Sequence, residues 1–108
     1  MYTPKEHPEV DLQVQNLWHV FTVAEQLGDE KSVDEFYRDL MDIFGSNLYV
    51  LTAMYLVTNW KLWDAFKKDP EGALARKYDQ LWDETRDHAL EVLKDRKDDL
   101  RFFLEVTD

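Results

Sequence analysis

Hydrophobic residues recur every three or four positions along most of this chain, which is the spacing of an amphipathic helix. Strand signals are missing, because no alternating run of β-branched residues is bounded by turn residues. The few glycines and prolines fall where a helix would begin or end. The pattern predicts an all-α protein that folds as an antiparallel bundle of about four helices.

The helix limits follow from turn and capping residues. Pro8 suits a first helical turn and Gly28 a helix end, while Ser32 and Glu35 have the spacing of a capping box. A length of 108 residues fits one domain, so we expect residues 1–108 to form a single helical unit. The helices are expected at about residues 8–27, 33–44, 47–68 and 70–93, with a C-terminal helical extension over about 100–106.

The last helix is expected to be long and to be bent or broken near residues 94–99. That segment, KDRKDD, has no apolar side chain, so a helix through it would have no face to bury. Apolar residues resume in LRFFLEV, at residues 100–106.

Residues 48–66, LYVLTAMYLVTNWKLWDAF, form the most apolar segment. Polar residues interrupt it too early for a membrane span, which needs about 20 apolar residues, so we expect no membrane partner. In the second half of this helix, Lys61, Asp64 and Lys68 share one side, which we expect to face solvent. The same side is apolar in the first half, although a bundle helix normally keeps one face in water.

Something must therefore cover this apolar side. The C-terminal LRFFLEV segment, a second copy of the chain and a partner protein are the three alternatives. We favour a homodimer, whose state analytical ultracentrifugation would measure. The residues expected in its oligomer interface are Val50, Ala53, Met54 and Val57.

The charge of the chain points to the kind of partner. With 23 acidic and 13 basic residues, the formal net charge is -10. Such a surface repels nucleic acid and anionic membranes and attracts basic proteins. We therefore expect a basic protein partner and no direct nucleic-acid binding. The expected partner-binding face consists of the acidic residues on the second helix and its approach: Asp29, Glu30, Asp34, Glu35, Asp39 and Asp42.

Carboxylates held on a rigid helix can take the place of DNA phosphates in a nuclease or another nucleic-acid-binding protein. Toxin immunity proteins and phage-encoded blockers of host defence are small acidic helical inhibitors of that class, an analogy of class rather than of sequence. We expect a non-enzymatic protein-interaction module, and an inhibitor of this type is its sharpest form. The alternative is a homo-oligomeric structural or regulatory accessory protein whose acidity only keeps it soluble.

Four tryptophans fall on or beside the predicted apolar stripes, so packing in the core is their default role. Trp60 and Trp63, near the basic end of the third helix, are the pair expected to be partly exposed. Exposed tryptophans are frequent anchors of protein interfaces, which makes this pair a candidate aromatic hot spot.

Enzymatic chemistry has little support in the sequence. There is no cysteine and no glycine-rich phosphate loop, and Ser32 and Ser46 are better explained as helix caps than as nucleophiles. A metal-dependent all-α nucleotide hydrolase is the second alternative, because the acidic pairs Glu30/Asp34, Glu35/Asp39 and Glu84/Asp87 have spacings that could hold magnesium. The segment DETRDHALE also places carboxylates and an imidazole on one helical face, as a metal site in a bundle needs. Its candidate metal ligands are Glu84, His88, Asp87 and Glu91. We favour a solvated charged face there, and expect no metal and no cofactor.

The expected location is the cytoplasm. The lack of cysteine suits a reducing compartment. The N-terminal residues MYTPKEHPEVD also lack the basic-then-apolar pattern of a secretory signal.

Overall fold

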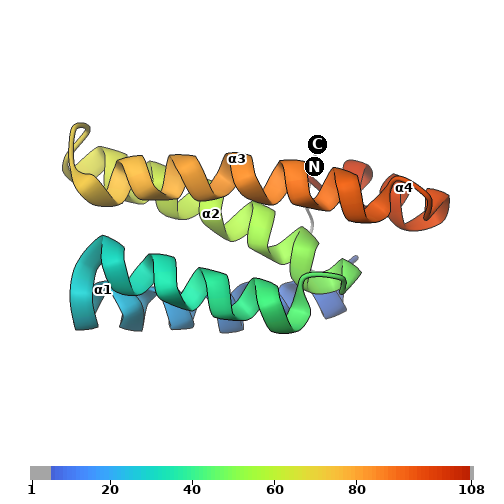
Figure 1. The fold of residues 1–108 in the computed structure, drawn as a ribbon, viewed down its shortest axis with the longest axis horizontal. Helices are drawn as coiled ribbons and strands as arrows, with labels where there is room; N and C mark the ends of the chain where they lie inside the picture. The colour runs from blue at the N-terminus through green and yellow to red at the C-terminus, as the bar shows by residue number, and fades with distance from the viewer. Residues whose placement is uncertain (1–5, 108) are drawn as a thin grey trace.

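The computed structural model describes residues 6–107, which contain helices and connecting turns but no strand. Residues 1–5 and 108, which include part of the N-terminal segment considered above for a signal peptide, lie outside the described residues. The expected all-α helical bundle is confirmed (Figure 1). Its helices are α1 (Pro8–Phe44), α2 (Leu48–Lys68), α3 (Ala73–Leu93) and α4 (Lys97–Thr107). None of these four is long and apolar enough to cross a membrane.

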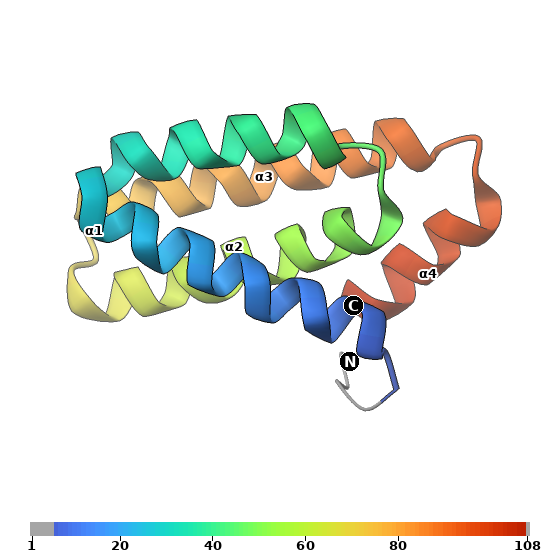
Figure 2. The same cartoon turned by 90° about the horizontal axis from the view of Figure 1, so that it is seen from below.

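Helix α1 folds back on itself at Gly28 and Asp29. The backbone is non-helical at both residues, with φ -168° and ψ 30° at Gly28 and φ 52° and ψ -137° at Asp29. The first limb (residues 8–27) and the second limb (residues 30–44) therefore run in opposite directions, as Figure 2 shows. The expected end of a helix at Gly28 is confirmed. Because the turn is so short, Ser32 lies inside the second limb, and the expected capping box with Glu35 is not formed.

The turn places Asp29 in a backbone conformation that glycine adopts far more readily than other residues. We expect Asp29→Gly to raise the free energy of unfolding by about 1 kcal/mol, and the melting temperature by about 4–8 °C. Urea denaturation measures this change. Glu30→Gly, at the next and helical residue, is the matched control and should lower stability by about 1 kcal/mol. A destabilised Asp29→Gly protein would contradict the strain at this turn.

Helix α2 is bounded by capping bonds at both ends. The Asn47 side chain accepts hydrogen bonds from the backbone N–H groups of Tyr49 and Val50, at 3.0 and 3.1 Å. At the other end, the Asp69 N–H bonds to the Ala65 carbonyl at 2.9 Å. Asp69 therefore closes α2 and does not open α3. Residues 69–72 form a turn, so α3 begins at Ala73 and not at residue 70 as expected.

Helix α2 is the centre of the molecule, and this overturns the expected oligomer interface. Those interface residues are at most 6% exposed within the single chain: Val50, Ala53, Met54 and Val57. Ala53, Met54 and Val57 belong to the same core cluster as Val10, Val14 and Leu17 of α1 and Val106 of α4. The assignment to an interface is wrong because, within residues 6–107, helices α1, α3 and α4 all pack on α2.

Helix α4 supplies the cover on the outer side of α2. Helix α3 ends at Leu93, and α4 then runs back across the molecule to end beside the start of α1 (Figure 2). Phe103 and Val106 are buried in this contact. Of the three covers considered, the C-terminal segment is the one that contributes, through Val106, but the first limb of α1 also covers this side and was not among them. The helix is interrupted at residues 94–96. A long, bent last helix is not observed, since α3 and the 11-residue α4 are two separate helices.

Candidate functional site

The second half of α2 has an uncovered aromatic strip on its outer side. Leu56 is only 8% exposed under the cover, whereas Trp63, two turns further on the same face, is 52% exposed. The reason is length, because α4 spans about 16 Å and α2 about 32 Å at 1.5 Å per residue. Trp60 and Phe66 are also exposed. The prediction that Trp60 and Trp63 are partly exposed is confirmed, and their role as a hot spot stays a prediction.

Lys61 lies on the inner side of α2, not in solvent. Its side chain is 3% exposed, and its ammonium group lies 3.2 Å from the carboxylate of Glu25. The same group donates a hydrogen bond of 2.7 Å to the Thr22 hydroxyl and sits 4.0 Å from the centre of the Trp18 ring. The expectation that Lys61 shares a solvent side with Asp64 is therefore wrong, because the first limb of α1 supplies partners for a buried charge.

Tyr78 of α3 completes this buried cluster. Its ring is fully buried, and its hydroxyl donates a short hydrogen bond of 2.5 Å to the Glu25 carboxylate. Burial, reinforced by the neighbouring carboxylate, raises the pKa of Tyr78 far above its ordinary value, so the phenol keeps its proton. Glu25, Lys61 and Tyr78 join α1, α2 and α3. The cluster fixes the register of these three helices and has the character of a structural group.

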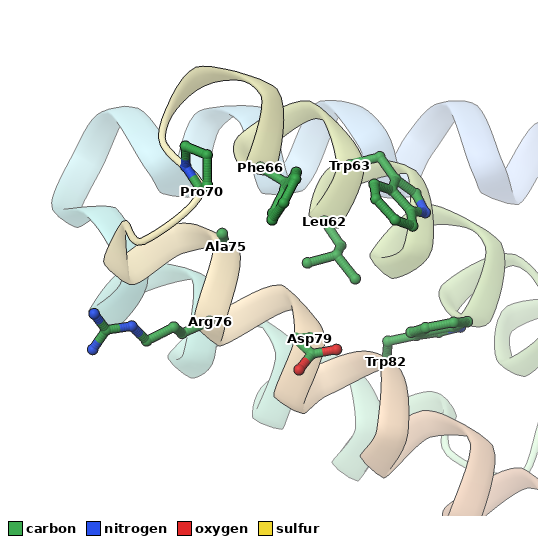
Figure 3. A pocket seen from close by; sticks show the side chains of 8 residues that line it. All are labelled: Leu62, Trp63, Phe66, Pro70, Ala75, Arg76, Asp79 and Trp82. Carbon is green, nitrogen blue, oxygen red and sulfur yellow. The ribbon is translucent and has the colours of Figure 1, made fainter.

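A groove with a volume of about 410 Å³ opens between the exposed strip of α2 and the first half of α3 (Figure 3). Its lining residues are Leu62, Trp63, Phe66, Pro70, Ala75, Arg76, Asp79 and Trp82. Trp63 and Phe66 pack edge to face, with ring centres 5.7 Å apart. The indole nitrogen of Trp82 is buried and has no hydrogen-bond partner within residues 6–107. Aromatic walls with few polar groups are typical of a binding site.

The two charged residues of the groove differ in their partners. The Arg76 guanidinium donates to the Glu71 carbonyl at 2.8 Å, and Figure 3 shows it pointing away from the aromatic rings. Asp79, by contrast, makes no hydrogen bond or ion pair with any described residue. The groove therefore carries one positive and one negative group, neither in an ion pair with a described residue, and of the two only Asp79 also lacks a hydrogen bond.

The residues of the expected acidic face separate into three groups. Asp34 turns toward α3, where its carboxylate lies 3.2 Å from both Lys77 and Arg38. Asp29 forms the turn of α1, and Glu30 is half-buried beside it. The exposed members share one side of the second limb and make no ion pair among the described residues; we call these the ridge: Glu35, Asp39 and Asp42.

Arg38 ties the second limb to α3 through the Glu84 carboxylate, and it also pairs with Asp34 of its own limb. A hydrogen bond from Arg38 lowers the pKa of Glu84 below its ordinary value, although partial burial opposes the shift. At Asp34 burial also opposes ionisation, but the Lys77 hydrogen bond and the Arg38 charge outweigh it and lower the pKa. Ionised carboxylates in these pairs therefore stabilise the fold.

Because both pKa values are lower in the folded than in the unfolded state, this stabilisation is complete above the unfolded values and is lost as the pH falls through the folded ones. We expect the free energy of unfolding to decline below about pH 4.5. Arg38→Gln should flatten that decline and cost less than about 1 kcal/mol at neutral pH, since the groups are partly exposed. Denaturation at several pH values tests this. Arg86→Gln is the control, and an identical acid decline in both variants would contradict the prediction.

The candidate metal ligands of α3 face different partners. Glu84 is held by Arg38, and His88 donates from Nε2 to the Gly45 carbonyl at 2.8 Å. Asp87 and Glu91 pair with their neighbours Arg86 and Lys94 on the exposed side of the helix. In the part of the chain that the structure describes, no three His, Asp or Glu side chains are grouped to hold a metal ion.

Sequence reasoning missed the buried cluster and the groove. The signal for Lys61 was present, because it follows Met54 and Val57 at helical spacing on the buried stripe of α2. Asp79 and Trp82 carried no comparable signal, since a groove between two helices depends on how they pack.

Comparison with known proteins gives no further guidance, because no family model, no curated protein and no solved structure matches this chain. What the protein does is therefore inferred from its own residues.

Proposed function

We propose that this protein is a non-enzymatic interaction module that binds a basic protein partner. The observation that carries the proposal is the ridge of Glu35, Asp39 and Asp42, three exposed carboxylates without ion pairs among the described residues. Arg38 lies between them in sequence but is turned toward Glu84 and Asp34, so it leaves the ridge charged. Such a surface attracts a basic protein over distances of about a Debye length.

Helix α3 adds negative charge beside the ridge. The second limb and α3 run in the same direction, since Asp34 contacts Lys77 near their starts and Gly45 contacts His88 further along. Asp87 and Glu91 are exposed on α3, but Arg86 and Lys94 partly neutralise them. The ridge therefore carries most of the unbalanced charge on this face.

The density of that charge limits how closely the ridge resembles DNA. At 1.5 Å per residue, its carboxylates lie about 5 Å apart along the helix, whereas duplex DNA has one charge per about 1.7 Å. This supports attraction of a basic protein surface in general. Blocking of a nuclease or another nucleic-acid-binding protein is the narrower use, and the identity of the captured partner decides it.

Charge reversal tests the proposal. We expect the protein to capture a basic partner from its native host at low salt and to lose it above a few hundred millimolar salt, roughly. The variant Glu35→Lys, Asp39→Lys, Asp42→Lys should fold normally and capture nothing. The matched control reverses three other exposed acids, Glu71→Lys, Asp95→Lys and Glu105→Lys, which changes the net charge equally.

Two outcomes would contradict the proposal. Capture by the ridge variant at the level of the control would show that the ridge is not the binding face. Sedimentation as a dimer without any captured partner would favour the homo-oligomeric accessory protein instead.

A further inference from the structure

We propose that the groove between α2 and α3 binds an arginine side chain of the partner, with the guanidinium stacked on its aromatic rings and paired with Asp79. This rests on the proposed function, because it assumes a basic partner, and it assigns a specific site to that partner. The groove volume of about 410 Å³ is small for a ligand site and suits one long side chain better than a large ligand.

The walls of the groove favour a flat cation. Trp63 and Phe66 of α2 lie on one side and Trp82 of α3 on the other, with the Leu62 side chain between them (Figure 3). A cation near the face of an aromatic ring is attracted by the ring's negative charge distribution, and tryptophan is the strongest partner. The guanidinium is planar and weakly hydrated, so it stacks on an indole better than a lysine ammonium does.

Asp79 determines which charge the bound side chain should carry. Its carboxylate belongs to the lining and has no partner within residues 6–107, while Arg76 is engaged by the Glu71 carbonyl. An apolar side chain would displace water from this carboxylate without forming a hydrogen bond or ion pair to replace it, which is unfavourable. A guanidinium would replace the water with a charged hydrogen bond. The Asp79 carboxylate therefore favours an arginine over an apolar side chain, and Arg76 keeps its charge but points away from the aromatic rings (Figure 3).

Exposure makes the site accessible. Trp63 and Phe66 lie beyond the reach of α4, so no segment among the described residues covers them. The net charge of -10 and the ridge draw a basic partner toward the molecule from a distance, whereas the groove acts at contact.

The test uses three short peptides, acetyl-Gly-X-Gly-amide, in which X is arginine, citrulline or norleucine. Citrulline has the shape of arginine without its charge, and norleucine is apolar. We expect the arginine peptide to shift the indole N–H signals of Trp63 and Trp82 saturably in NMR titrations at 150 mM salt. Both other peptides should bind at least about fivefold more weakly, as expected from loss of a cation–π contact and an ion pair.

Matched variants locate the binding. Asp79→Asn should weaken the arginine peptide about two- to fivefold, and Trp63→Ala by a similar factor. Asp83→Asn and Trp60→Ala, which change an exposed carboxylate and an exposed indole outside the lining, should bind as the wild type does. All four positions are exposed, so the fold should persist in each variant.

Equal binding of the citrulline or norleucine peptide, or full affinity in Asp79→Asn, would overturn the arginine site. Failure of this site and failure of the proposed function are distinguishable. If capture depends on the ridge but the arginine peptide does not bind, only the arginine site in the groove is contradicted. If the arginine peptide binds but capture does not depend on the ridge, only the proposed role of the ridge is contradicted.

Discussion

We expect Val57→Asp to lower the free energy of unfolding of this protein by about 4 kcal/mol or more. Val57 is fully buried in the middle of α2, between the first limb of α1 and α4. Its neighbours in the core are apolar, and the nearest cation, Lys61 one turn further on, is already paired with Glu25, so a carboxylate at Val57 must be desolvated without a counter-charge of its own. The loss is comparable to the whole stability of a small domain, which is about 5–15 kcal/mol.

Circular dichroism and urea denaturation measure this effect. Val57→Ala offers a milder version, with an expected loss of about 1–2.5 kcal/mol, in case the aspartate variant does not accumulate. Ile43→Asp is the matched control, because Ile43 is 71% exposed and a charge there stays in water. A folded monomeric Val57→Asp protein derived from a dimeric wild type would show that Val57 lies between subunits after all.

The second large effect is expected at the buried ion pair of Glu25 and Lys61. Glu25→Gln leaves the ammonium of Lys61, which is 3% exposed, without its counter-charge. We expect a loss of about 2–4 kcal/mol, somewhat below the usual value for breaking a buried pair because Glu25 is 21% exposed. Lys61→Met should cost only about 1 kcal/mol, since Met fills the space and Glu25 keeps its bond from Tyr78.

A double-mutant cycle separates the pair from its surroundings. The double variant Glu25→Gln, Lys61→Met should be more stable than Glu25→Gln alone, because the unpaired buried charge is gone. The control pair is Asp64 and Lys68, which are exposed and 3.2 Å apart on α2. Neutralising that pair should change stability by less than about 0.5 kcal/mol. Equal losses in Glu25→Gln and Lys61→Met would contradict the asymmetry.

The helices themselves could be predicted from local signals. The end of a helix at Gly28 follows from residue type and spacing. Ser46 and Asn47 are both capping residue types, and the structure forms the cap at Asn47. Where prediction failed, a neighbouring turn decided the limit. A helix was expected from residue 70, but the Asp69 N–H closes α2 and residues 69–72 form a turn, so α3 begins at Ala73.

The candidate sites were harder to predict than the helices, because they depend on how the helices pack against one another. Six acidic residues of one segment had the same character in the sequence, yet Asp34 pairs with Lys77 of α3 while Asp39 stays free of any described partner. Asp79 and Trp82 gain their interest only because Trp63 of another helix lies opposite them. Contacts between residues far apart in the chain leave no mark on the local spacing of either partner.

By itself the sequence determined that the chain is helical, acidic and divided by its glycines and prolines, because helical period, charge and turn preference are properties of neighbouring residues. Which side of α2 faces the core was decided only by the tertiary structure. The turn of α1 at Asp29 and the short length of α4 determine which helices pack against each part of α2. As a result, Val57 is buried, Lys61 is paired with Glu25 and Trp63 is left exposed.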